Sequence, residues 1–424
     1  MHKIERLLQT LAPKGVEFKT LEEVFEIKNG YTPSKNNPEF WEKGTIPWFR
    51  MEDIRENGRI LKDSIQHITP KALKNKKLFP KNSIIISTTA TIGEHALLIV
   101  DSLANQRFTF LSKKANCGIA LDMKFFFYQC FLLGEWCKNN TNVSGFASVD
   151  MAAFKKYKFP IPPLEIQQEI VKILDAFTEL NTELNTELKA RKKQYQYYQN
   201  MLLDFKDINS NHQDAKEKLE QKTYPKRLKT LLQTLAPKGV EFRKLGEVCD
   251  FQKGKSITKK AVTFGKVPVI SGGRQPAYYH NEANRSGETI AISSSGVYAG
   301  YVSYWDIPVF LADSFSVSPK QKTLMPKYLF HYLTTQQDAI HATKSTGGIP
   351  HVYSKDLQNF LIPIPPLEIQ QEIVKILDQF LALTTDLLAG IPAEIEARKK
   401  QYEYYREKLL SFKHLTPHKE VKKC

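Results

Sequence analysis

The sequence predicts an α+β fold: two mixed α/β globular domains separated by two long helices that form an antiparallel coiled coil, with a pseudo-two-fold internal repeat. Three observations predict it. The residues PIPPLEIQQEIVKILD occur twice without change, at 160–175 and at 363–378. Each copy opens an apolar stripe with heptad spacing. Each also follows a long variable segment, in which short β-branched runs alternate with Gly, Pro and Ser.

Two further repeats show that the halves are parallel copies. LLQTLAPKGVEFKTLEEV at 7–24 returns as LLQTLAPKGVEFRKLGEV at 231–248, and RKKQY at 191–195 returns at 398–402. Identical copies indicate either a recent duplication or a shared partner surface, and the divergence of the variable segments favours the partner surface. The predicted parts are a lead segment 1–24, a first variable domain 25–159, a central helix and linker 160–230, a second lead segment 231–248, a second variable domain 249–362, and a C-terminal helix and tail 363–424.

The repeated segments predict long helices. After each proline pair, apolar residues follow in alternating steps of four and three, which is typical of a helix that packs on another helix. An ordinary amphipathic helix on a globular core is the alternative. Gly390 and Pro392 are expected to kink or split the second helix. The seam consists of Ile166, Ile170, Ile173, Phe177, Leu180 and Leu184 in the first copy, and of Ile369, Ile373, Ile376, Phe380, Leu383 and Leu387 in the second.

A tandem repeat of four residues stands inside the first helix. The units TELN, TELN and TELK begin at Thr178, Thr182 and Thr186. They lie between the two ends that the halves share, so their number would set the length of the helix between the variable domains. The alternative is that they only extend an ordinary helix.

The net charge of +16 indicates a polyanionic partner, with nucleic acid as the first candidate and a solvated lysine-rich surface as the alternative. No apolar run approaches the length of a membrane span, so no membrane partner is expected. The five cysteines form no CxxC pair, and the first residues do not resemble a signal peptide. These features predict a cytoplasmic protein.

No enzyme signature is complete in this sequence. Gly254-Lys255-Ser256 ends like a phosphate-binding loop, but Cys249 stands where the loop requires a glycine. Residues 37–40 only weakly resemble the NPPF loop of amino-methyltransferases, and the ten histidines show no metal-ligand spacing. We therefore expect no catalytic residue, no metal and no cofactor in this chain. A methyltransferase or nuclease with scattered site residues, and a coiled-coil adaptor without DNA binding, are the rival classes.

The variable segments carry clusters of residues suited to DNA. Lys and Arg neutralise phosphates, while Arg, Ser, Thr, Asn and Gln contact base edges. For any single residue, a turn or core position is the alternative. The first-segment candidates are Tyr31, Thr32, Lys35, Trp48, Arg50, Thr88, Thr89, Thr91, Arg107, Ser144 and Ser148. The second-segment candidates are Lys253, Lys255, Ser256, Arg274, Ser293, Ser294, Ser295, Tyr298, Lys344, Ser345, Thr346 and His351.

The order of variable segment, proline-led helix, variable segment and the same helix closely resembles the specificity subunit (HsdS) of type I restriction–modification systems. The resemblance is carried by FPIPPLEIQQEIVKILDAF, IPIPPLEIQQEIVKILDQF and the RKKQY endings, and it spans nearly the whole chain. It implies that the variable segments are target recognition domains, each reading one half of a bipartite, asymmetric site in double-stranded DNA. A specificity subunit of a methylation-only or type IIG-like complex is the alternative.

The resemblance also implies partners and cofactors. The helices would form a spacer that docks two modification subunits, which carry S-adenosylmethionine and methylate adenine. Two restriction subunits with motor and nuclease activity, using ATP and Mg²⁺, would join where restriction accompanies modification. The expected docking residues are Leu164, Ile166, Ile170, Leu367, Ile369 and Ile373.

Overall fold

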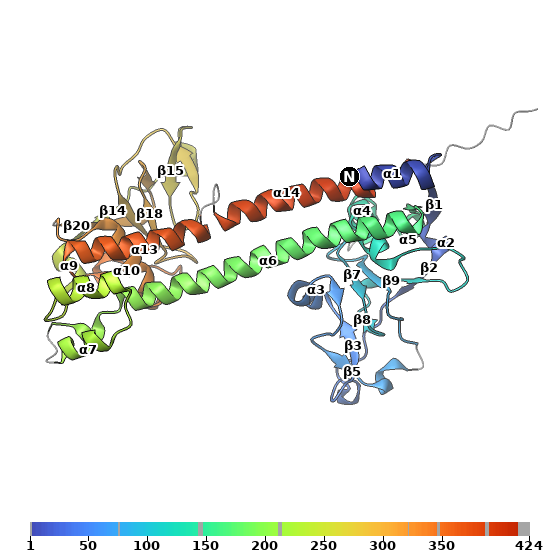
Figure 1. Ribbon diagram of the computed structural model, residues 1–424, viewed down its shortest axis with the longest axis horizontal. Coiled ribbons are helices and arrows are strands. Elements are labelled where there is room, and N and C mark those ends of the chain that lie inside the picture. Colours follow the sequence, from blue (N-terminus) through green and yellow to red (C-terminus); the bar gives the residue numbers. More distant parts are fainter. Residues whose placement is uncertain are drawn as a thin grey trace, which may run out of the picture. The chain divides into compact units, whose positions relative to one another are not determined.

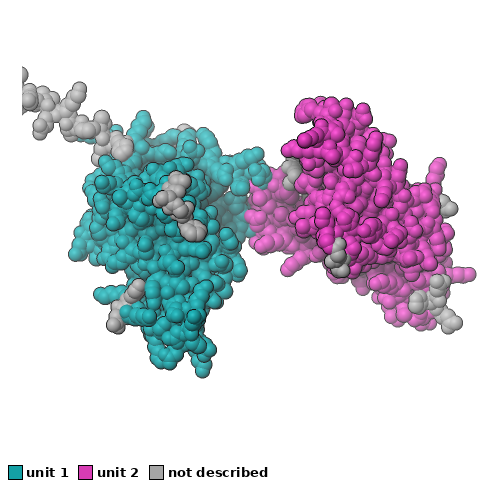
Figure 2. Space-filling view, turned by 180° about the vertical axis from the view of Figure 1, so that it is seen from behind, with its two compact units in different colours: residues 1–183, 396–424 teal, residues 184–395 magenta. Residues whose placement is uncertain are grey.

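The chain folds into two compact units (Figures 1 and 2). The computed structural model describes residues 2–74, 77–142, 147–210, 214–320, 322–345, 348–385 and 390–413. Unit 1 comprises residues 1–183 and 396–424, and unit 2 comprises residues 184–395. The helix α6 (Leu164–Leu203) is continuous and contributes to both units. Within the described ranges, no helix combines the length and the apolar character needed to cross a bilayer.

Unit 1 holds two larger sheets, two two-stranded sheets and several helices. β-Branched and aromatic runs such as IIIS and FTFLSK form its buried strands. The larger sheet has the order β2 (Phe25–Asn29), β9 (Phe108–Lys113), β6 (Ile84–Ser87), β7 (His95–Leu98), β4 (Ile60–Leu61), and the smaller has β5 (His67–Ile68), β3 (Ile46–Phe49), β8 (Leu103–Ala104). Two-stranded sheets pair β1 (Glu17–Thr20) with β12 (Lys158–Ile161) and β10 (Thr141–Asn142) with β11 (Ser148–Val149). The other helices are α1 (His2–Leu11), α2 (Leu21–Val24), α3 (Met51–Asn57), α4 (Met123–Asn139) and α5 (Met151–Lys155).

Unit 2 repeats most of this topology with different residues, without counterparts of β4 and of the β10–β11 pair among its described residues. Its sheets have the orders β14 (Cys249–Lys253), β20 (Ser314–Pro319), β17 (Thr289–Ser293), β18 (Val302–Trp305), and β16 (Tyr278–His280), β15 (Val267–Ile270), β19 (Phe310–Leu311). β13 (Glu241–Lys244) pairs with β21 (Leu361–Ile364) as β1 pairs with β12. The helices are α7 (Ala215–Gln221), α8 (Lys226–Leu235), α9 (Leu245–Val248), α10 (Pro326–Thr335), α11 (Gln337–Ala342), α12 (Ser354–Leu357), α13 (Leu367–Thr385) and part of α14 (Ile391–Leu410). The internal repeat is therefore structural as well as sequential.

A buried glutamine in each copy of the repeated segment holds the helix to its own variable domain. Gln167 accepts a hydrogen bond from the amide of Asp122 (2.8 Å) and donates to the carbonyls of Ala120 (2.9 Å) and Pro162 (2.7 Å). Gln370 makes the same three contacts in unit 2, with the amide of Met325 and the carbonyls of Thr323 and Pro365, at 2.9, 2.8 and 2.7 Å. These contacts inside each unit give a second reason for the identity of the glutamine in both copies, and the expected shared partner surface stays a prediction.

Salt bridges repeat in the same way. Asp175 binds Lys124 of α4 at 2.6 Å, and Asp378 binds Lys327 of α10 at 2.6 Å. Their second partners differ: the hydroxyl of Tyr128 donates to Asp175 (2.6 Å), whereas His331 lies 2.9 Å from Asp378. Each helix is thus anchored at matched positions, and only the second partner has changed.

Long helices pair antiparallel within each unit, as the seam predicts. In unit 1 the ring of Phe177 lies 5.6 Å from that of Tyr405, while Leu409 and Leu410 join the core around the start of α6. In unit 2 the ring of Tyr198 lies 4.9 Å from that of Phe380, and the end of α6 shares a core with the start of α13. The second helix is described as α13 and α14, with Gly390 immediately before α14, in agreement with the expected break. The seam residue Leu387 lies outside the described residues.

Replacing Asp378 should destabilise unit 2 in a pH-dependent way. Burial raises the pKa of the Asp378 carboxyl, but the hydrogen bonds from His331 and Lys327 outweigh it and hold the pKa below its ordinary value of 3.8. Because the folded-state pKa is lowered, this stabilisation is present above about pH 4 and is lost as the pH falls through the folded pKa. Asp378→Asn should lower the free energy of unfolding by about 1–2 kcal/mol at pH 7, a value reduced for the partial exposure of the pair.

Urea denaturation at pH 7, 5, 4 and 3.5 measures this effect, with hydrogen exchange in α10 reporting on unit 2. The difference between wild type and variant should shrink below pH 4. Asp175→Asn is the matched variant for unit 1, where a tyrosine replaces the histidine. A difference for Asp378→Asn that stays constant from pH 7 to pH 3.5 would contradict the proposed linkage.

Candidate nucleic-acid interface

Matched backbone hydrogen bonds define equivalent positions in the two variable domains. In both units, the amide after the first strand of the larger sheet donates to the carbonyl of the first residue of the neighbouring strand, at 2.8 Å. A second bond is also shared. In unit 1 the amide of Thr88, after β6, donates to the carbonyl of Arg107, before β9 (3.1 Å), and in unit 2 the amide of Ser294, after β17, donates to the carbonyl of Asp313, before β20 (3.0 Å). Isolated β-bridges at Thr89 and Ser295 complete the match. The equivalent pairs are Gly30 with Gly254, Thr88 with Ser294, Thr89 with Ser295, Arg107 with Asp313, Phe108 with Ser314, and Ser148 with His351.

Glycine is required at one of these pairs. A Cβ atom on Gly30 would lie 2.2 Å from the carbonyl oxygen of Asn105, and one on Gly254 would lie 2.5 Å from that of Leu311. Only glycine permits such a close approach of two backbone segments. The glycines therefore bring the segment after the first strand against the turn that holds Arg107 or Asp313.

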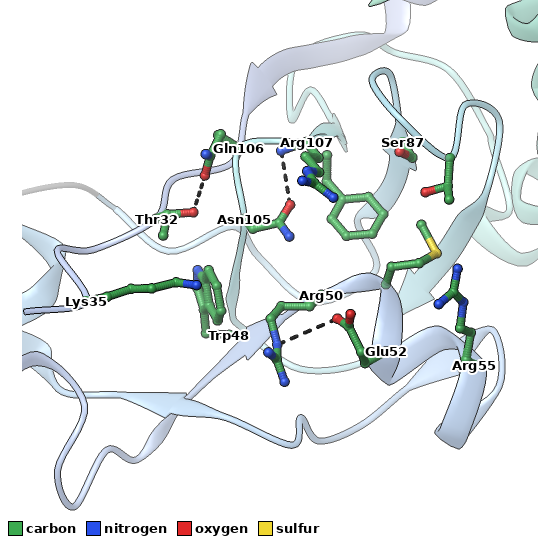
Figure 3. Close-up of a pocket in the computed structure, with 13 residues that line it drawn as sticks. Thr32, Lys35, Trp48, Arg50, Glu52, Arg55, Ser87, Asn105, Gln106 and Arg107 are labelled. Carbon is green, nitrogen blue, oxygen red and sulfur yellow. Dashed lines mark hydrogen bonds and ion pairs between the residues drawn. The ribbon is translucent and has the colours of Figure 1, made fainter. Parts of the chain in front are cut away.

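Unit 1 has a basic pocket of about 320 Å³ at this place (Figure 3). Three arginines surround it: Arg50 at the N-cap of α3, Arg55 within the same helix, and Arg107 before β9. Thr32 and Lys35 line it from the loop after β2. The pocket combines guanidinium, amide and hydroxyl groups, which are the donors that proteins use toward phosphates and base edges.

The side chains around the pocket are held to different degrees. The Nε atom of Arg50 lies 3.8 Å from the Glu52 carboxylate, and its guanidinium carbon lies 5.9 Å from the centroid of the Trp48 ring. The amide of Arg107 donates to the side-chain oxygen of Asn105 (3.0 Å), which fixes the turn. The hydroxyl of Thr32 donates to the side chain of Gln106, and both residues line the pocket (Figure 3).

Unit 2 has an open pocket of about 630 Å³ at the equivalent place. It shares the positions of Thr32, Arg107 and Phe108, which are Ser256, Asp313 and Ser314 in this unit. The Ser295 hydroxyl donates to the Asp313 carboxylate. Nearby, the guanidinium of Arg274 lies over the rings of Tyr298 (4.9 Å) and Tyr301 (5.6 Å). The two units thus present different chemistry on one backbone frame.

The structure brings together most of the predicted residues of unit 1. Two of the predicted residues are buried: Trp48, whose indole donates to the carbonyl of Tyr31 (2.9 Å), and Thr88, whose hydroxyl pairs with that of Thr109 (2.9 Å). Thr89 and Ser148 meet at a β-bridge, and Ser144 lies outside the described residues. The predicted residues that line the pocket are Thr32, Lys35, Trp48, Arg50, Thr91 and Arg107.

The predicted residues of unit 2 are spread more widely. Ser293 is buried and donates to the carbonyl of Ser271 (3.1 Å), so it supports the strand rather than the surface. The ammonium of Lys344 donates to the Val297 carbonyl (3.3 Å). Lys255 is exposed but does not line the pocket, Ser345 accepts a hydrogen bond from the His351 amide (3.2 Å), and Thr346 lies outside the described residues. The predicted residues that line the pocket are Lys253, Ser256, Ser294 and His351.

Sequence reasoning missed several lining residues. In unit 1 these include Arg55, Asn105 and Gln106, and in unit 2 they include Asp313 and Lys355. The run NQRF holds two of them beside the predicted Arg107, so the local cluster was a usable signal. Nothing in the sequence marked Asp313, because an acid beside DNA runs against the expected charge.

The predicted docking residues divide into two groups. Ile166, Ile170, Ile369 and Ile373 are fully buried in the cores of their own units, so their side chains are not accessible to a partner. Leu164 and Leu367 are each 37% exposed at the start of the helix. A docking surface for a partner subunit therefore remains a prediction only for the exposed leucines and their neighbours.

The fold defines a class of protein with two mixed α/β domains and long helices. Among the described residues, no group of three His, Cys, Asp or Glu side chains could hold a metal ion. The family model "Type I restriction modification DNA specificity domain" matches residues 13–194 and 237–397. The chain therefore belongs to the type I restriction–modification specificity-subunit family, which confirms the resemblance seen in the sequence.

Individual relatives agree with this assignment. The chain is 40% identical over 402 residues to the type I restriction enzyme EcoprrI specificity subunit of Escherichia coli, covering 91% of this chain and 93% of the relative. A crystal structure of the type I restriction–modification S subunit from M. genitalium has a TM-score of 0.57 at 19% identity, covering 93% and 96% of the two chains. A chain from a structural study of type I assembly and conformational transition has a TM-score of 0.58 at 18% identity, covering 93% and 97%. The structures share the fold.

Proposed function

We propose that this chain is the DNA-recognition subunit of a type I restriction–modification complex, in which each unit reads one half of a bipartite, asymmetric target. The observation that carries the proposal is the shared backbone frame with divergent pocket side chains. A protein that reads two different half-sites can use the same backbone fold twice, but it needs a different set of base-contacting side chains in each copy. The exposed arginines of unit 1 and the net charge of +16 supply attraction to phosphates.

The proposal assigns chemistry to partners rather than to this chain. Two modification subunits would dock near the exposed starts of α6 and α13, bring S-adenosylmethionine and methylate adenine. Restriction subunits with ATP and Mg²⁺ would join where cleavage accompanies modification. This chain would bind and orient DNA without catalysing either reaction, and it would act in the cytoplasm, where the chromosome is accessible.

Methylome sequencing of cells with and without this gene tests the proposal. Deletion should abolish methylation at one bipartite adenine motif, and complementation with this chain should restore it. A methylome unchanged by the deletion, in cells that express the modification subunit, would refute the assignment. A motif consisting of one continuous block would refute the division of labour between the units.

Binding to DNA should weaken steeply with salt, and Lys35→Ala should reduce that dependence. Lys35 is exposed at the pocket of unit 1, where its ammonium can neutralise a phosphate. Losing one phosphate contact should lower the slope of log K against log salt by about 1 and weaken binding to all sequences equally. Titration of the complex with modification subunits against mixed-sequence duplex measures this. Lys408→Ala, on α14 of the same unit, is the control and should leave the slope unchanged.

A further inference from the structure

The equivalent residues Arg107 and Asp313 have opposite charge on one backbone frame. Their carbonyls accept matched hydrogen bonds from Thr88 (3.1 Å) and Ser294 (3.0 Å), so the two positions are equivalent in the structure, although the sequences around them do not align visibly. Both side chains are exposed and both line the pocket of their unit. A position that keeps its backbone hydrogen bond and reverses its charge is the place to look for a difference in specificity.

Arg107 is an available donor of the unit 1 pocket. Its turn is fixed by the hydrogen bond to Asn105 (3.0 Å), and the neighbouring Gln106 is held by Thr32 (Figure 3). The guanidinium itself has no hydrogen bond or ion pair to the residues that the structure describes, whereas Arg50 is engaged with Glu52 and Trp48. Because the backbone of Arg107 is fixed, its planar guanidinium group can donate two hydrogen bonds to the O6 and N7 acceptors of guanine.

Asp313 places a negative charge in the pocket of unit 2. An exposed carboxylate in a pocket that also contains Lys253 and Lys355 would be repelled by DNA phosphates unless it gains a compensating contact. Ser295 donates to one oxygen of the carboxylate and orients it, and no described cation forms an ion pair with it. The remaining acceptor capacity matches the exocyclic amino group of cytosine, which is the base-edge donor that Asp and Glu accept in the major groove.

We propose that this shared position is the principal base-reading position of each unit, with Arg107 recognising a guanine in one half-site and Asp313 recognising a cytosine in the other. The proposal rests on the proposed function and adds residues and bases to it. The charge reversal would make the two half-sites differ at the equivalent place, so that a symmetric frame reads an asymmetric target.

Motif mapping of variants tests this in cells that carry the modification subunit. Arg107→Ala should relax one guanine position in one half-site, lowering discrimination at that position by about 5- to 150-fold, while the other half-site stays unchanged. Asp313→Asn and Asp313→Ala should relax one position in the other half-site only. The unchanged half-site shows in each case that the protein still folds and assembles. Lys408→Ala, at an exposed position of α14 in the same unit and outside the pocket, is the control and should leave both half-sites unchanged.

Three results would overturn the proposal. Arg107→Ala could lower methylation equally at all sequences without altering the motif, which would make Arg107 a phosphate contact. The relaxed base could be one other than guanine for Arg107 or cytosine for Asp313. Both substitutions could alter the same half-site. A wild-type methylome without any bipartite motif would instead refute the proposed function, so the two failures are distinguishable.

Discussion

Gln370→Leu should lower the free energy of unfolding of unit 2 by about 2–4 kcal/mol. The Gln370 side chain is fully buried, and it joins the helix start at Pro365 to the amide of Met325, one residue before α10. Leucine keeps the volume of the side chain but cannot form hydrogen bonds. The variant therefore deprives the Met325 amide and the Pro365 carbonyl of this partner, at about 1–2 kcal/mol for each group left unpaired.

Two substitutions on the same repeated segments serve as comparisons. Gln371→Leu changes the neighbouring exposed glutamine and should cost less than about 0.5 kcal/mol. Gln167→Leu should weaken unit 1 as Gln370→Leu weakens unit 2, because its three contacts are the same. Denaturant unfolding of the full chain gives the free energies, and hydrogen exchange at the starts of α4 and α10 assigns them to units. Equal tolerance of Gln370→Leu and Gln371→Leu would show that internal contacts do not explain the identity of the repeats.

The long helices and the two-fold repetition could be predicted from the sequence because both are periodic. Heptad spacing gives α6 and α13, and matched segments give the halves. The contacts of Gln167 and Gln370 could not be predicted, although both residues lie in the repeated sequence segments. Their partners stand about 45 residues upstream in variable segments, so only the fold brings them together.

The pockets were only partly predictable for a different reason. Residue type identified Arg50 and Arg107 as DNA-binding candidates, and both line the unit 1 pocket. Residue type also selected Trp48, Thr88 and Ser293, which are buried, because composition does not reveal the direction of a side chain. The equivalence of Arg107 and Asp313 depends on backbone hydrogen bonds alone, which no comparison of side chains could find.

Deleting residues Thr182–Asn185 should shorten the unread gap between the half-sites by one base pair and leave both half-sites unchanged. These four residues form one TELN unit inside the continuous helix α6, at the boundary where unit 1 ends and unit 2 begins. The hydroxyl of Thr182 donates to the carbonyl of Thr178 (2.8 Å), so its polar side chain is accommodated on the helix backbone. The four residues thus add length to the helix without belonging to either pocket.

Helix and DNA geometry give the expected size of the change. Four residues advance an α-helix by ~6 Å and turn it ~40° beyond a full turn. One base pair advances DNA by ~3.4 Å and turns it ~35°. The two rotations agree, and base readout requires each unit to face its groove. We therefore expect the rotation to determine the change in gap, and the excess change in length to be absorbed by helix tilt or DNA bending.

Mapping the methylated motif of the deletion variant measures the gap directly. Methylation at the original motif should fall at least ~10-fold, since misplacing one half-site costs at least as much as a mismatched base pair. Substituting Thr182 and Asn185 by alanine keeps the helix length and should leave the motif intact. An unaltered gap in the deletion variant would show that this segment does not set the spacing. Changed bases in either half-site would show that the segment acts on the recognition domains themselves rather than on the distance between them.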